Sequence, residues 1–147
     1  MFAEFEQEVH SRIENGEILN AEKLGNIYVD LCRKYYGEDL VIDEYNKYNW
    51  TRVNHFFRCF YVYKYATGYA SAVALSENIL KNGEVAVKPY LEFLSMGGSK
   101  YPLEELQHAG VDWSSPAPAE AALQKFERIL EEAEKCYEQI HSQSTSL

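Results

Sequence analysis

Apolar residues recur at three- and four-residue steps through most of the chain, which is the period of an amphipathic helix. The first such segment covers residues 2–13, and Gly16 follows it at the position of a helix C-cap. A second segment begins after Asn20, a favourable N-cap residue, and ends at Gly37. The pattern therefore predicts two amphipathic helices near the N-terminus, followed by a loop or a short helical turn over residues 38–50.

A third helix is predicted from near Phe60 to Asn82, where Gly83 stops it. Alanines and Gly68 give its middle small side chains, which favours a close approach by another helix. The next helix is predicted over Val85–Ser95. Proline is tolerated only near the start of a helix, so Pro89 favours a start later than Val85. The remaining predicted elements are a turn over Met96–Pro102, a helix over Leu103–Ala109, an extended connection over Asp112–Pro118 and a last helix from about Ala119 to Ile140.

No run of β-branched residues alternates long enough to indicate a strand, so the predicted fold class is all-α. The length of 147 residues suits one compact multi-helix domain, which we place at residues 1–141, with a frayed tail at 142–147.

The net charge is −9, from 23 acidic and 14 basic residues, and the basic residues are scattered. Nucleic acid and anionic membranes both need a basic patch, so neither is an expected partner. The N-terminus is acidic where a secretory signal would be basic. The cysteines, Cys32, Cys59 and Cys136, lie far apart and form no CxxC pair, which predicts reduced thiols in a cytoplasmic protein.

Candidate chemistry is concentrated between residues 50 and 69. His55 precedes the third predicted helix, and Tyr61, Tyr65 and Tyr69 then recur every fourth residue, which places them on one helical face. A histidine and phenols on a rigid element can stabilise an oxyanion that develops on a substrate carbonyl. Tyr63 is predicted to face away from Tyr61 and Tyr65.

Each of these features also has an ordinary structural reading. A histidine before a helix is usually a surface or capping residue, and tyrosines at helical spacing usually pack in a core or an interface. Cys59, four residues after His55, could form a nucleophilic pair with it, but no oxyanion hole or third orienting group accompanies the pair. The acidic residues Glu127, Glu131, Glu132 and Glu134 form a solvated helix face more readily than a metal site.

Four segments of the chain, in order and at suitable spacing, resemble the C-terminal part of oligoendopeptidase F and its relatives. These segments are FAEFEQEVHSRIENGE, LCRKYYGEDL, HFFRCFYVYKYATGYASAVALSENIL and YLEFLSMGGSKYPLEELQHAGVDW. The family consists of cytoplasmic zinc metallopeptidases that cut short peptides. The resemblance implies a domain like the C-terminal part of a zinc oligopeptidase catalytic domain.

The resemblance also assigns roles to residues. His55 matches the family's histidine ahead of the tyrosine helix, and it is expected to bind the substrate carbonyl together with Tyr65, the first choice for the oxyanion role, and Tyr61. Tyr63 and Tyr69 are expected to contact the peptide. The family holds zinc through an HExxH helix and a further glutamate, whereas this sequence contains no HExxH. We therefore expect no cofactor in this chain, zinc in the full-length family, and an inactive C-terminal portion when it is alone.

A second hypothesis is a non-catalytic helical module that binds peptides or another chain. In that case the surface that faces the missing catalytic half, the former cleft wall, would be exposed and would be covered by a partner or by self-association.

Overall fold

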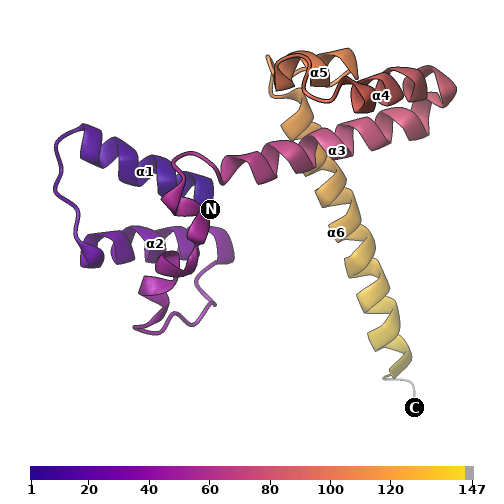
Figure 1. Ribbon diagram of the computed structural model, residues 1–147. Helices are drawn as coiled ribbons and strands as arrows, with labels where there is room; N and C mark the ends of the chain where they lie inside the picture. The colour runs from indigo at the N-terminus through magenta and orange to yellow at the C-terminus, as the bar shows by residue number, and fades with distance from the viewer. Residues whose placement is uncertain (145–147) are drawn as a thin grey trace. The chain divides into compact units, whose positions relative to one another are not determined.

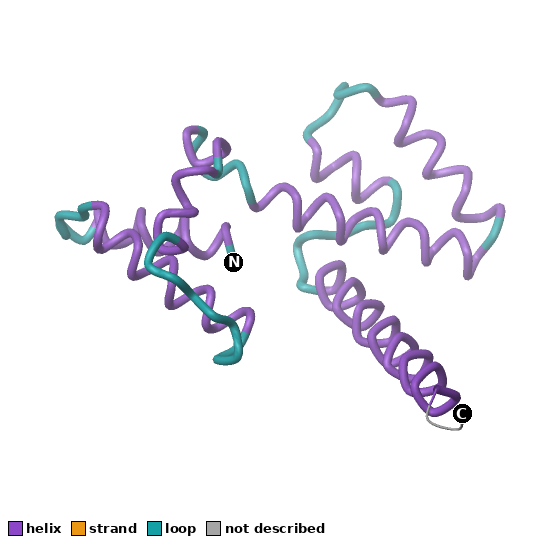
Figure 2. Tube along the Cα trace, turned by 90° about the horizontal axis from the view of Figure 1, so that it is seen from below, coloured by secondary structure: helices purple, strands orange, loops and turns teal. Residues whose placement is uncertain are grey.

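The structure is a computed structural model that describes residues 1–144, and this part of the chain contains helices and no strand. Its elements, in chain order, are α1 (Phe2–Glu14), α2 (Ala21–Tyr36), the 3₁₀ helices η1 (Asn46–Arg52) and η2 (Asn54–Phe57), α3 (Tyr63–Asn82), α4 (Glu84–Met96), α5 (Pro102–His108) and α6 (Ala117–Ser144) (Figures 1 and 2). The all-α prediction is confirmed. The chain divides into two compact units, Met1–Tyr65 and a second that begins at Ala66. The single domain at 1–141 stays a prediction.

The first unit is built on α1 and α2, which lie side by side (Figure 1). Asn20 caps α2 as predicted, because its side chain accepts a hydrogen bond from the Lys23 N–H at 2.9 Å. Phe5 of α1 meets Tyr28 of α2 edge to face, with 5.8 Å between the ring centroids. The buried core of this unit consists of Phe5, Ile27, Tyr28, Leu31 and Cys32.

A close backbone approach joins α2 to η1 within this unit. A Cβ atom added at Gly25 would lie 3.2 Å from the carbonyl oxygen of Lys47 and 3.3 Å from its Cβ. Glycine at this position therefore lets the two helical segments touch through their backbones.

The second unit has its core where α3, α4 and α5 meet. Leu75, Ala109 and Val111 are buried there, and Trp113 packs against them while its Nε1–H donates to Ser71 Oγ at 2.8 Å. The long helix α6 runs away from α4 and α5 (Figure 1). Its side chains from Phe126 to Ser142 are all exposed. An apolar stripe on α6 is therefore open to solvent within this unit.

Several predicted boundaries need correction. α3 begins at Tyr63, three residues later than predicted, because Phe60 has a left-handed backbone with φ +56°. α4 begins at Glu84 and contains Pro89, so the proline did not delay its start. The predicted extended connection is shorter and consists of turns and bends, since α6 begins at Ala117.

The close helix approach predicted at Gly68 is wrong, since a Cβ atom at this exposed position would meet nothing within 4 Å. α6 continues to Ser144, through the first residues of the predicted frayed tail, and residues 145–147 lie outside the described part. No helix among residues 1–144 is both long enough and apolar enough to cross a membrane.

Candidate functional site

His55 is carried by η2, a short turn that is anchored on α1. The neighbouring residue Phe56 packs its ring against Phe5 and Phe2, with centroid distances of 5.2 and 6.0 Å. His55 itself is exposed. The core contact of Phe56 therefore holds the backbone of the turn while the imidazole faces solvent.

Three side chains converge at this turn, and we call His55, Tyr61 and Tyr65 the His55 cluster. The Tyr65 hydroxyl lies 3.1 Å from His55 Nε2, which is hydrogen-bonding distance. The ring of Tyr61 stacks on the imidazole with 5.2 Å between centroids and an interplanar angle of 7°. Tyr65 meets both rings edge to face, at 5.4 Å from His55 and 5.9 Å from Tyr61. All three residues belong to the first unit.

The way in which Tyr61 reaches the cluster differs from the prediction. Tyr61 precedes α3 and does not lie on its face, because the chain turns through the left-handed Phe60 before the helix starts. The Tyr61 carbonyl accepts a hydrogen bond from the Lys64 N–H at 3.2 Å, which leads the chain into the helix. Sequence periodicity placed Tyr61 and Tyr65 together for the wrong reason.

Tyr65 keeps its proton more firmly than an ordinary tyrosine. Partial desolvation raises the pKa of Tyr65, and the neighbouring Tyr61 adds to the increase through a hydrogen bond and through charge repulsion. The Lys64 ammonium lies 5.3 Å from the centre of the Tyr61 ring, in the range of a cation–π contact. The cluster is thus a neutral hydroxyl and an imidazole held beside a fixed aromatic ring.

The other two predicted tyrosines, Tyr63 and Tyr69, are not members of the His55 cluster. Tyr63 is the first residue of α3, and its side chain is 46% exposed. Tyr69 lies in the second unit and is 70% exposed. Their predicted contacts with a peptide stay predictions.

The residues that the structure describes do not fit a zinc site. No group of three or more His, Cys, Asp or Glu side chains within residues 1–144 could hold a metal ion. His55 Nε2 is already paired with the Tyr65 hydroxyl. A tetrahedral zinc site needs three or four such ligands held by the fold.

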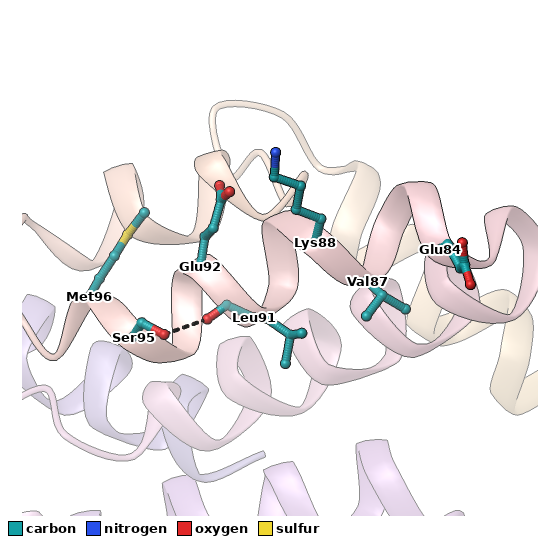
Figure 3. A pocket seen from close by; sticks show the side chains of 7 residues that line it. All are labelled: Glu84, Val87, Lys88, Leu91, Glu92, Ser95 and Met96. Atoms are coloured by element: carbon teal, nitrogen blue, oxygen red, sulfur yellow. Dashed lines mark hydrogen bonds between the residues drawn. The ribbon is translucent and has the colours of Figure 1, made fainter.

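A hollow of about 600 Å³ lies along α4 (Figure 3). Its lining comes from one face of a single helix, and the Ser95 hydroxyl there donates to the Leu91 carbonyl of the preceding turn at 2.8 Å. Its charged side chains are Glu84, Lys88 and Glu92. Because it contains no histidine or tyrosine, this hollow offers less for chemistry than the His55 cluster.

Comparisons with known proteins give a consistent result. The model of peptidase family M3 matches residues 1–125. The chain is 50% identical to oligopeptidase PepF of Bacillus subtilis over 135 residues, which cover 92% of this chain and 20% of PepF. It is 41% identical over 138 residues to an oligoendopeptidase F homolog of Borreliella burgdorferi, covering 94% of this chain and 23% of that protein.

A crystal structure of a candidate peptidase from Chlamydophila abortus matches with a TM-score of 0.78 and 39% identity. The match covers 89% of this chain and 22% of that chain. The chain thus spans about a fifth of the length of the curated relatives it matches.

Proposed function

Since the chain belongs to peptidase family M3, we propose that it supplies the groups that bind and polarise a substrate carbonyl during the hydrolysis of short peptides. The observation that carries this proposal is the convergence of the Tyr65 hydroxyl and His55 Nε2, 3.1 Å apart on an exposed surface. Two hydrogen-bonding groups at this spacing can serve a single oxygen atom.

The hydrogen bond between the two groups can orient the donor. When Nε2 carries a proton, His55 donates to the Tyr65 oxygen, and the hydroxyl proton of Tyr65 is free to point at a substrate carbonyl. Tyr65 is protonated near neutral pH as any tyrosine is, and its pKa is raised further. Tyr61 limits the imidazole to one ring plane by stacking on it and is the next candidate for a substrate hydrogen bond.

Family M3 depends on zinc, and no set of residues within 1–144 fits that ion. We therefore propose that another part of an M3 protein holds the metal and that this chain alone does not hydrolyse peptides. Its proposed partners are short peptides and the part of the protein that holds the metal. Its proposed location is the cytoplasm.

A chimera with a longer relative tests this function. The aligned 135-residue segment of B. subtilis PepF would be replaced by the matching residues of this chain, and cleavage of a quenched fluorescent oligopeptide would be measured. We expect an active chimera that loses activity with Tyr65→Phe or His55→Gln. Tyr45→Phe is the matched control, because this tyrosine of the first unit is 74% exposed and has no predicted role in the site.

Two results would contradict the proposal. One is an active chimera in which Tyr65→Phe and His55→Gln leave kcat unchanged. The other is peptide turnover by the isolated chain in proportion to its concentration, which would show that it needs no other part.

The second candidate function is a non-catalytic helical module that associates with itself or binds another chain. The observation that favours it is the apolar stripe of α6, where the exposed side chains include Phe126, Ile129, Leu130 and Tyr137. Sedimentation at several concentrations would test it. A strictly monomeric chain that binds no hydrophobic dye would contradict self-association.

A further inference from the structure

Two side chains of α1 contact Phe60, the residue that precedes Tyr61 in the chain. The carboxylate of Glu6 accepts a hydrogen bond from the Phe60 backbone N–H at 2.7 Å, although the two residues are 54 positions apart. One helical turn further along α1, the His10 ring lies 4.6 Å from the Phe60 ring, centroid to centroid. The same face of α1 therefore holds both the backbone and the side chain of Phe60.

Glu6 is an unusual residue to find at this place. Its side chain is buried, with 5% exposure, and burial of a carboxylate is unfavourable unless hydrogen bonds satisfy it. Its carboxylate accepts a hydrogen bond from Phe60, the only non-glycine residue with positive φ in the described part of the chain. For a bulky side chain this backbone conformation is strained and persists only where the surroundings enforce it.

The constraint on Phe60 passes directly to the His55 cluster. Tyr61 follows Phe60 in the chain, stacks on His55, and is linked to the start of α3 by its carbonyl. We infer that Glu6 is a positioning residue, which fixes the left-handed turn at Phe60 and thereby sets the placement of Tyr61 and Tyr65 against His55. This inference rests on the proposed function for its meaning in catalysis, but its test does not need a substrate.

The experiment is NMR of the histidine ring protons in the 147-residue chain, with the His55 signals assigned from their loss in His55→Gln. The Tyr61 ring, stacked on the imidazole in a nearly parallel plane, should shift these protons upfield. We expect Glu6→Ala to abolish that upfield shift, because the turn is no longer held. Glu6→Gln should keep it, since the amide oxygen still accepts from the Phe60 N–H. Glu14→Ala, at the exposed end of α1, is the matched control and should also keep it.

A folded Glu6→Ala chain with unchanged His55 signals would overturn the inference. If Glu6→Ala does not fold, the double variant Glu6→Ala/Phe60→Gly decides the matter, because glycine adopts a left-handed backbone without strain. Recovery of both the fold and the upfield shift would support the positioning role of Glu6. If either is not recovered, Glu6 acts only as a core residue and the inference is overturned. No peptide is present in any arm, so a PepF chimera whose kcat is unchanged by Tyr65→Phe and His55→Gln would refute the proposed function and leave this result intact.

Discussion

Gly25 and Gly68 are both inside helices, and the structure predicts opposite responses when each is replaced by alanine. Alanine in an exposed helix interior is about 1 kcal/mol more favourable than glycine. At Gly68 nothing within 4 Å opposes the added methyl group, so Gly68→Ala should raise the free energy of unfolding by about 1 kcal/mol. For a chain of this length the melting temperature should rise by about 4 °C.

At Gly25 the same gain is opposed by contact with η1. The added Cβ would lie 3.2 Å from a backbone oxygen, Lys47 O, which cannot rotate away as a flexible side chain could. Overpacking of this kind costs about 1–3 kcal/mol. The net change for Gly25→Ala is therefore expected to lie between about zero and a loss of about 2 kcal/mol.

Urea unfolding followed by far-UV circular dichroism, with both variants measured beside the unchanged chain, gives the two free energies. Each measurement is repeated at two protein concentrations to detect self-association. If Gly68→Ala lowers stability, another chain covers that face of α3 in solution and the reasoning fails. If Gly25→Ala gains as much as Gly68→Ala, the contact with η1 is not tight.

Four further expectations follow from the site and its surroundings. In the PepF chimera, Tyr65→Phe should lower kcat by ~10²-fold with little change in KM, as for other donors that act in the transition state, and an unchanged kcat would move the role to Tyr61. Hydrogen bonds from Lys34 and Tyr35 hold the pKa of the Glu4 carboxyl below its ordinary 4.5. The ionised carboxylate therefore stabilises the fold above that pH, and this stabilisation is lost as the pH falls through the lowered pKa. Glu4→Gln should flatten this part of a plot of unfolding free energy against pH. A thiol reagent should modify exposed Cys59 and Cys136 quickly and Cys32 slowly, because burial raises the pKa of the Cys32 thiol, and three equally fast thiols would contradict the packing of the first unit. Elemental analysis of the untagged chain should find no stoichiometric zinc, with no metal-dependent rise in melting temperature, and about one zinc per chain would overturn this.

The sequence predicted the helices well where a local signal marks their ends. Asn20 and Gly37 bound α2 as predicted, because capping depends on neighbours a few residues away. The start of α3 was missed, since a left-handed phenylalanine has no sequence signature and here depends on a carboxylate 54 residues away. The open surroundings of Gly68 were missed for a related reason, because small side chains permit a close approach but do not supply a partner.

The structure brings three of the predicted site residues together, whereas the roles assigned to them, and to Tyr63 and Tyr69, stay predictions. His55, Tyr61 and Tyr65 do come together, although Tyr61 lies outside the helix that was expected to carry it. The resemblance to a known family selected these residues, and periodicity alone would have grouped Tyr69 with them. Glu6 could not be found this way, since an acidic residue in an amphipathic helix is expected on the solvent face.

The hydrogen bond between Glu6 and Phe60 also has a consequence for the order of folding. It closes a loop of 54 residues that contains all of α2 and η1. The entropy of closing such a loop is recovered only when the intervening segments are compact, so long-range contacts of this kind form after local ones. The His55 cluster should therefore assemble late, after α1, α2 and η1 have packed. Its NMR signals would then report whether the whole first unit has completed folding.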